Sequence, residues 1–156
     1  MSEQEIFQHL FSISSRSDDV RGVVASCFVR DGKILVDAVS NNEGIHSEYA
    51  LLLEMKKINI SVQPGDIVYT TVEPCGKRTP GGIGERYGDC TTNLIESGVK
   101  HIVYAAGDPD ASNSTRHKFS DAGVILEQIP DKDTVNLAVQ LFNSTHLDPG
   151  GYLPNQ

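Results

Sequence analysis

The sequence predicts an α/β protein, a three-layer α/β/α sandwich with a central mixed five-stranded sheet. Two observations support this fold class. A β-hairpin pattern stands in the first third of the chain, and strand-like segments alternate with helix-like segments after it, which implies parallel crossovers. A chain of 156 residues can bury roughly 68–70% of its unfolded surface. We therefore expect one compact domain with helices on both faces of the sheet.

The first part of the chain is expected to form a helix and a hairpin. Ser2 and Glu5 have the spacing of a capping box and precede an amphipathic segment. Two apolar runs rich in β-branched residues then flank an Asp-Gly turn. The two strands of this hairpin are expected at 23–29 and 33–39.

The middle of the chain is expected to add a helix, a strand and a second helix. Apolar residues recur at helical spacing from 45 to 57. An apolar run at 66–72 then predicts a strand that ends in Glu73-Pro74-Cys75. The next helix is expected at 90–97, where Gly98 would end it as a left-handed residue.

The last third is expected to complete the sheet. Strands are predicted at 101–106 and 124–129, with helices at about 114–121 and at 131–142. The final helix has an apolar face that would close the core. The predicted domain spans residues 1–145, and the tail, residues 146–156, is expected to be irregular.

Composition excludes several classes of function. A net charge of −8 opposes nucleic-acid binding, because such binding depends on clustered Lys and Arg. Three cysteines without a close pair indicate reduced thiols and a cytoplasmic protein. No apolar run approaches the ~18 residues of a membrane span, and the acidic N-terminus does not resemble a secretory signal. We expect no nucleic-acid or membrane partner.

Four residues near element boundaries could form a catalytic zinc site. His46, Cys75 and Cys90 would supply one imidazole and two thiolates, and a catalytic Zn²⁺ takes three protein ligands with a fourth position open. The two thiolates balance the charge of the ion. Glu48 would be the catalytic acid and base. Side chains two residues apart do not share a helix face, so His46 must precede the regular part of its helix.

A non-catalytic zinc-binding scaffold is the structural alternative. A histidine on the surface or a Pro-Cys dipeptide signals little alone, but the order of these motifs along the chain favours an enzyme. Glu48 supports the same choice, because a structural zinc site has no use for a free carboxylate.

These motifs resemble the zinc-dependent cytidine deaminase-like superfamily, whose pattern is His-x-Glu followed by Pro-Cys-x-x-Cys. The glutamate in that pattern carries protons and does not bind the metal. Here 14 residues separate Cys75 from Cys90, where the usual pattern has two. A widened gap is similar to that of the riboflavin-biosynthesis pyrimidine deaminases (diaminohydroxyphosphoribosylaminopyrimidine deaminase type). Stretches shared with those enzymes are Glu73-Pro74-Cys75, Arg78-Thr79-Pro80, Gly98-Val99, Asp108-Pro109-Asp110 and Ala122-Gly123-Val124.

The resemblance implies a reaction and its partners. The reaction would be the zinc-dependent hydrolytic deamination of a diaminopyrimidinone carrying a ribosyl or ribityl phosphate, with release of ammonia. It also implies a homo-oligomer, such as a dimer. Since 156 residues leave no room for a reductase domain, a separate reductase protein is expected in the pathway. A deaminase of another free base, nucleoside or small heterocycle is the nearest alternative.

The segment between the two cysteines is a candidate substrate-binding loop. Residues 76–89 contain five glycines and one proline, and long loops in compact domains are commonly functional. Lys77, Arg78 and Arg86 place positive charge there, and guanidinium groups bind phosphate well. Asn42 could bind a sugar hydroxyl. A solvated loop and a simple turn explain these four residues equally well.

Overall fold

The computed structural model describes residues 1–78, 80–109 and 113–156. Its core is one sheet in the order β2-β1-β3-β4-β5. The strands are β1 (Ala25–Arg30), β2 (Lys33–Val39), β3 (Ile67–Val72), β4 (His101–Ala106) and β5 (Ile125–Gln128). β1 pairs antiparallel with β2 and β3, whereas β3, β4 and β5 are parallel. The predicted mixed five-stranded sheet is confirmed.

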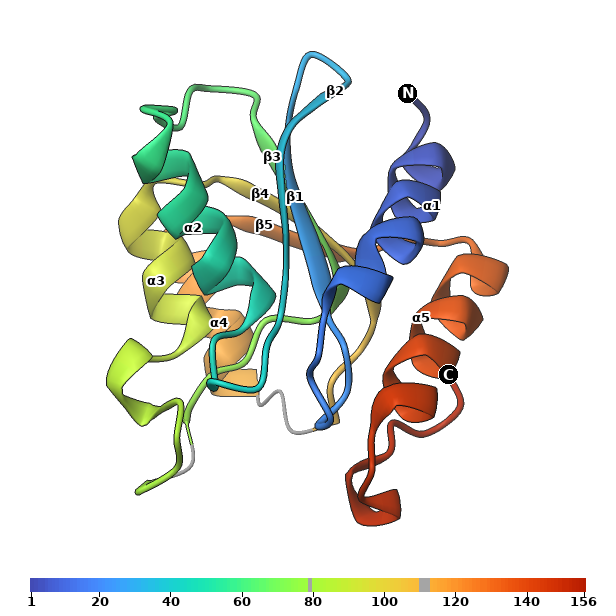
Figure 1. Cartoon of the computed structure of the whole chain (residues 1–156). Coiled ribbons are helices and arrows are strands. Elements are labelled where there is room, and N and C mark those ends of the chain that lie inside the picture. The colour runs from blue at the N-terminus through green and yellow to red at the C-terminus, as the bar shows by residue number, and fades with distance from the viewer. Residues whose placement is uncertain (79, 110–112) are drawn as a thin grey trace.

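Helices cover both faces of this sheet, as Figure 1 shows. α1 and α5 lie on one face, and α2, α3 and α4 lie on the other. The helices are α1 (Glu3–Ile13), α2 (Ser47–Lys57), α3 (Cys90–Ser97), α4 (Asn113–Asp121) and α5 (Lys132–Thr145). Short 3-10 helices are η1 (Ser14–Arg16), η2 (Glu85–Tyr87) and η3 (Pro149–Gly151). The three-layer prediction is therefore confirmed.

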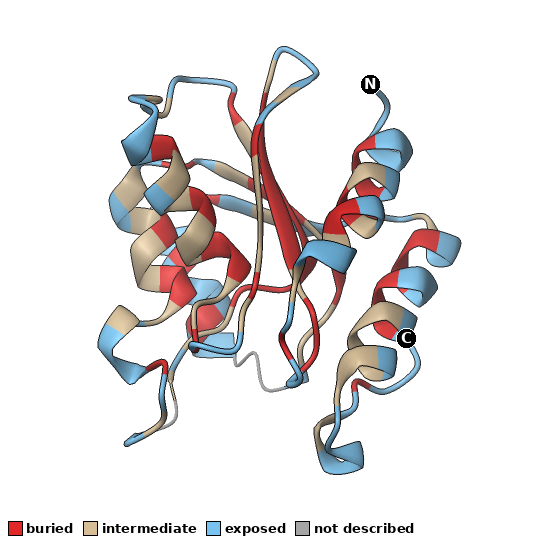
Figure 2. Cartoon of the chain, in the orientation of Figure 1, coloured by how far each residue is buried: buried red, intermediate tan, exposed pale blue. Residues whose placement is uncertain are grey.

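Each face of the sheet has its own hydrophobic core. Alternation along β1 sends Cys27 and Val29 toward α1 and α5, and sends Phe28 toward α2. Figure 2 shows the buried residues on the sheet and on the inner faces of the helices. Burying a side chain such as Phe28 stabilises the fold by about 1.5–3 kcal/mol.

Several predicted element ends follow from local chemistry. The hairpin turn has left-handed backbone at Asp31 (φ 51°) and Gly32 (φ 74°), as the twist of paired strands requires. β1 begins at residue 25 rather than 23, because the N–H of Val23 donates to Thr145 Oγ1 and that of Val24 donates to Ser40 Oγ. No helix among residues 1–78, 80–109 and 113–156 has the length and apolarity to cross a membrane.

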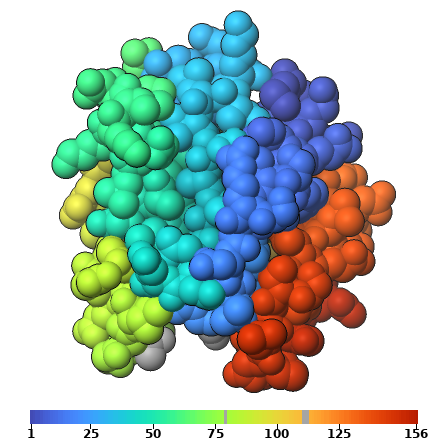
Figure 3. Space-filling model, viewed as in Figure 1, coloured from blue at the N-terminus to red at the C-terminus, as the bar shows by residue number. Residues whose placement is uncertain are grey.

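One end of the sheet gathers the features that matter for function. The carboxyl ends of β3 and β4 lie there, and open α/β sheets bind ligands beyond that edge. The insertion at 76–89 and the C-terminal segment lie at the same end, at the two lower corners of the molecule (Figures 1 and 3).

Candidate zinc centre

His46 stands just ahead of α2. It is the N-cap residue, with extended backbone (φ −75°, ψ 157°), and its side chain makes no capping hydrogen bond. The imidazole is therefore available for another partner. Its Nδ1 lies 3.5 Å from Cys75 Sγ and 3.4 Å from Cys90 Sγ. The helix was predicted to begin at 45, but the extended backbone at His46 delays it to Ser47.

The two cysteines come from different elements that are joined by hydrogen bonds. Cys75 follows β3, and Cys90 is the first residue of α3 and is fully buried. The backbone N–H of Cys90 donates to Cys75 Sγ at 3.3 Å. Thr91 donates to the Cys75 carbonyl through its N–H at 3.1 Å and its hydroxyl at 2.8 Å. These contacts hold the start of α3 against the end of β3.

The donor atoms of His46, Cys75 and Cys90 fit a zinc ion. All three lie within 4.8 Å of one another. Tetrahedral zinc with bonds of about 2.3 Å to sulfur and 2.0–2.1 Å to nitrogen would separate nitrogen from sulfur by about 3.6 Å. The observed separations of 3.4 and 3.5 Å agree with that value. One imidazole and two sulfurs are also the ligand set of catalytic zinc sites with an open fourth position.

The pKa values of the two thiols are shifted in opposite directions in this arrangement. A hydrogen bond from the Cys90 thiol lowers the pKa of Cys75 despite its burial, with a further contribution from His46. The same hydrogen bond raises the pKa of Cys90, and burial and the neighbouring Glu48 carboxylate raise it further. Zinc would displace the remaining proton, because the metal binds thiolate.

Glu48 is buried beside this cluster and is held by serine hydroxyls. Its side chain lies in the first turn of α2, and the residue is 3% exposed. Oε1 accepts a hydrogen bond from Ser47 Oγ at 2.5 Å and from Ser26 Oγ at 3.3 Å. Ser26 Oγ in turn lies 2.9 Å from Thr70 Oγ1. The network fixes the carboxylate next to the metal ligands, as a proton carrier requires.

Glu73 of the Glu-Pro-Cys motif has a different role. Its carboxylate accepts two hydrogen bonds from Arg116 of α4, at 2.9 and 3.0 Å, and one from the N–H of Asp108 at 3.2 Å. This pair of hydrogen bonds holds the segment that follows β3 in place, two residues before Cys75. Sequence reasoning missed Arg116, because nothing in the local pattern of α4 indicates a partner 43 residues away.

A cavity of about 460 Å³ opens onto the cluster. His46, Glu48 and Cys75 line its inner part. Its outer walls come from several separate segments of the chain. They include Asp19 and Arg21 before β1, Lys77 and Arg78 in the insertion, and Tyr152 and Leu153 near the C-terminus. A cavity of this volume suits a small organic substrate.

The predicted substrate-binding residues occupy different places. Lys77 is exposed and lines the cavity, and Arg78 also lines it. Arg86 lies outside the lining, with its guanidinium 4.7 Å from the centre of the Tyr87 ring. Asn42 is also outside, and its Oδ1 accepts a hydrogen bond from the N–H of Val20 at 2.9 Å. All four assignments stay predictions. Thr79 and Asp110, which belong to the shared motifs, lie outside the described residues.

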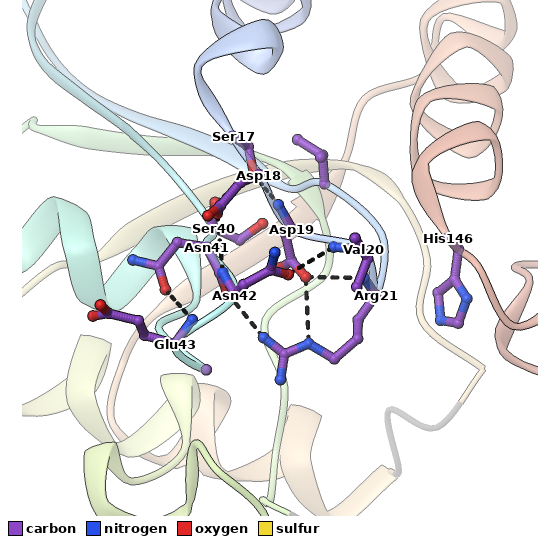
Figure 4. A network of polar contacts seen from close by, with 12 residues as sticks. Ser17, Asp18, Asp19, Val20, Arg21, Ser40, Asn41, Asn42, Glu43 and His146 are labelled. Atoms are coloured by element: carbon purple, nitrogen blue, oxygen red, sulfur yellow. Dashed lines mark hydrogen bonds and ion pairs between the residues drawn. The ribbon is translucent and has the colours of Figure 1, made fainter.

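Arg21 reaches the cavity from the loop before β1. Figure 4 shows it within a polar network that joins this loop to the turn after β2. Its Nε donates to Asp19 Oδ1 at 3.3 Å, and its Nη2 donates to the Asn41 carbonyl at 2.9 Å. The site therefore has a cation at a position that the resemblance did not assign.

The C-terminal segment folds back to form a wall of the cavity. His146 forms an isolated antiparallel bridge with Arg21. The side chain of Asn143 bonds the backbone N–H and C=O of Leu153, at 2.7 and 3.0 Å. Leu153 is buried, whereas the neighbouring Tyr152 is half-exposed and lines the cavity. The tail, expected to be irregular, carries the short helix η3.

Comparison with known proteins identifies a family match and one similar curated protein. Residues 1–106 match the family defined by the cytidine and deoxycytidylate deaminase zinc-binding region. The riboflavin biosynthesis protein RibD of Corynebacterium ammoniagenes is 31% identical over 93 residues, which cover 59% of this chain and 25% of that protein. The chain therefore matches only a part of that longer relative.

Solved structures share the fold at low sequence identity. Rib2 deaminase of Aspergillus oryzae superposes with a TM-score of 0.70 at 15% identity, covering 97% of this chain and 96% of that one. The diaminohydroxyphosphoribosylaminopyrimidine deaminase/5-amino-6-(5-phosphoribosylamino)uracil reductase of Thermotoga maritima gives 0.66 at 19% identity, covering 92% of this chain and 43% of that one. The dCMP deaminase of cyanophage S-TIM5 gives 0.61 at 19% identity, covering 83% and 99%.

Proposed function

Because the chain belongs to the cytidine and deoxycytidylate deaminase zinc-binding family, we propose that it deaminates a diaminopyrimidinone bearing a ribosyl or ribityl phosphate. The observation that carries the chemistry is the buried Glu48 carboxylate beside the His46, Cys75 and Cys90 donors. The likeness to RibD over 93 residues supports the choice of substrate.

The residues of the site would have separate roles in a hydrolytic deamination, which are metal binding and proton transfer. His46, Cys75 and Cys90 would hold the zinc, which when bound supplies a Lewis acid that lowers the pKa of water. Glu48 would take a proton from the attacking water and pass it to the ring nitrogen. It would then take the proton of the added hydroxyl group as the carbonyl forms and deliver that proton to the amine, which leaves as ammonia. The Ser26 and Ser47 hydroxyls keep the carboxylate oriented through both transfers.

Two cations are candidates for binding a substrate phosphate. Lys77 and Arg21 line the cavity, which also has acidic side chains such as Asp19 and Glu85 in its lining. A phosphate at the mouth would accept charge-assisted hydrogen bonds from these two cations. Arg21 and Arg78 offer less than Lys77, because two of the three nitrogens of each guanidinium already donate to other groups. We place Lys77 first among the predicted phosphate contacts.

The proposal is tested by metal analysis combined with ammonia release. Purified protein should hold about one zinc per chain and release ammonia from the ribosyl phosphate, the ribityl phosphate or both. Dephosphorylated analogues should show a higher KM with a similar kcat. Ammonia release from cytidine, dCMP or a purine in preference to both phosphates would support a deaminase for another heterocycle. Stoichiometric zinc without turnover on any substrate would support the non-catalytic scaffold.

The partners and location are part of the same proposal. The product would require a reductase for the next step or the preceding one, and the Thermotoga maritima structure is named for both activities. Three free cysteines suit a reducing compartment such as the cytoplasm. A homodimer stays a prediction that light scattering can test.

A further inference from the structure

We infer that Arg78 is a positioning residue that holds the metal ligands in place by bridging the segments that carry them. Arg78 stands three residues after Cys75. Its Nε donates to the carbonyl oxygen of Gly88 at 2.8 Å, and Gly88 lies two residues before Cys90. One guanidinium thus joins the end of the β3 segment to the start of α3.

The same guanidinium also reaches the third ligand segment. Nη1 of Arg78 donates to the carbonyl oxygen of Gly44 at 3.0 Å, and Gly44 lies two residues before His46. Arg78 therefore touches the backbone near all three donors of the metal site. A planar guanidinium suits this bridging role, because its donors point in fixed directions.

The length of the insertion explains why a bridge is needed. Where two residues separate the cysteines, the chain itself keeps their sulfurs close together. Here 14 residues separate Cys75 from Cys90, and the entropy cost of closing a loop rises with its length. Thr91 secures Cys90 to Cys75, and Arg78 extends the restraint to the segment of His46.

The residues around Arg78 leave its guanidinium little room to move. Nη2 is buried and has no hydrogen-bond partner among the described residues. Gly84 and Gly44 allow the insertion to approach the turn before α2. A Cβ on Gly84 would lie 2.4 Å from Arg78 Nη1 and 2.6 Å from the Gly44 carbonyl oxygen. Arg78 lines the cavity, but two of its three nitrogens are directed to backbone carbonyls.

Zinc retention tests the inference without any substrate. Arg78→Ala should raise the dissociation constant for zinc at least tenfold, measured by competition with a chromophoric chelator, because residues that orient metal ligands typically contribute 10–100-fold. Arg78→Lys should recover part of the affinity. The matched control is Arg30→Gln, since Arg30 is hydrogen-bonded to Asp66 and Ser61 at the opposite end of β1. That variant should be less stable to urea but bind zinc as the wild type does.

A second variant distinguishes a positioning role of Arg78 from a direct contact of Arg78 with a substrate phosphate. Gly84→Ala keeps the charge of Arg78, but its Cβ would push the guanidinium away from the Gly44 carbonyl. Residue 84 has a backbone that alanine can adopt (φ −94°). This variant should also weaken zinc binding. The inference is overturned if both variants hold zinc normally while Arg78→Ala raises only the KM for phosphorylated substrates. It is also overturned if Arg30→Gln weakens zinc binding as much as Arg78→Ala does. The zinc measurements do not depend on which heterocycle is deaminated.

Discussion

The guanidinium of Arg116 donates two hydrogen bonds to the carboxylate of Glu73, from Nε to Oε2 at 2.9 Å and from Nη2 to Oε1 at 3.0 Å. The two partners differ in exposure, since the Glu73 side chain is 1% exposed and that of Arg116 is 48% exposed. The interaction also raises the pKa of Arg116. Removing one partner should therefore have a different effect from removing the other.

Arg116→Ala should destabilise the protein more than Glu73→Gln. The first change leaves a buried carboxylate with only the Asp108 N–H described as its donor, at a cost of about 1–3 kcal/mol. The second leaves a guanidinium that can turn into water, and we expect a loss of about 1 kcal/mol or less. Urea unfolding of both variants measures the difference. The reverse order would show that Glu73 is stabilised by other contacts.

Glu48→Gln should separate metal binding from catalysis. The amide keeps the volume of the side chain but cannot carry a proton, so kcat should fall by about 10²–10⁴-fold. Zinc content should stay normal because Glu48 is outside the donor cluster. His46→Ala should lose the metal itself. A Glu48→Gln enzyme with a normal rate would falsify the proposed role of this residue.

Ser47→Ala should weaken turnover without weakening substrate binding. Ser47 donates to Glu48 Oε1 at 2.5 Å from a fully buried position, so its loss frees the carboxylate to move. We expect kcat to fall about 10-fold, with KM and zinc content unchanged, since misplacement by about 1 Å can cost up to 100-fold. An equal change in KM would instead indicate a disturbed cavity.

Asp66 should make stability depend on acid pH. Hydrogen bonds from Arg30 lower the pKa of Asp66 below its ordinary value of about 3.9. A carboxylate whose pKa is lowered on folding stabilises the protein above the unfolded pKa, and the contribution disappears as pH falls through the folded pKa. Asp66→Asn should therefore cost about 1–3 kcal/mol at pH 7. In urea unfolding, the difference from the wild type should shrink below about pH 4. A difference that does not change with pH would contradict this explanation.

Most of the fold could be predicted because its signals are local. Capping residues, the Asp-Gly turn and hydrophobic periodicity each act within a few residues, and β2, α3 and β4 have the predicted bounds. The donor cluster was also predictable, since His46, Cys75 and Cys90 stand at element ends. The sequence predicted that His46 lies in an irregular first turn, because Glu48 must face the same metal, but it did not predict that α2 begins only at Ser47.

The missing parts depend on contacts between distant residues. Arg116 meets Glu73 across 43 residues, and Arg78 meets Gly44 across 34. Neither pair has a periodic or dipeptide signal. The sequence left open whether the insertion is a substrate loop or a solvated loop, and it did not show that Arg78 donates to the carbonyl groups of Gly44 and Gly88.

The C-terminal segment is the other part that sequence patterns left without a role, and it yields a final prediction. Asn143 fixes Leu153 through both backbone groups, and the ring of Tyr152 packs edge-on against His146, 6.1 Å between centres. This anchoring presents Tyr152 to the cavity that contains the metal ligands. The segment should therefore contribute to substrate affinity rather than to chemistry.

Asn143→Ala should raise KM several-fold while kcat and zinc content stay near those of the wild type. The change removes two hydrogen bonds, so the wall that carries Tyr152 becomes mobile at a cost of about 1–2 kcal/mol. Tyr152→Ala should have a similar effect on KM, and Tyr152→Phe should have little, because only the ring packs against His146. Ser144→Ala is the matched control, since that exposed hydroxyl donates a hydrogen bond to the Leu141 carbonyl of its own helix. A fall in kcat at unchanged KM would place the segment in the chemical step instead, because binding contacts shared by the ground and transition states change KM alone.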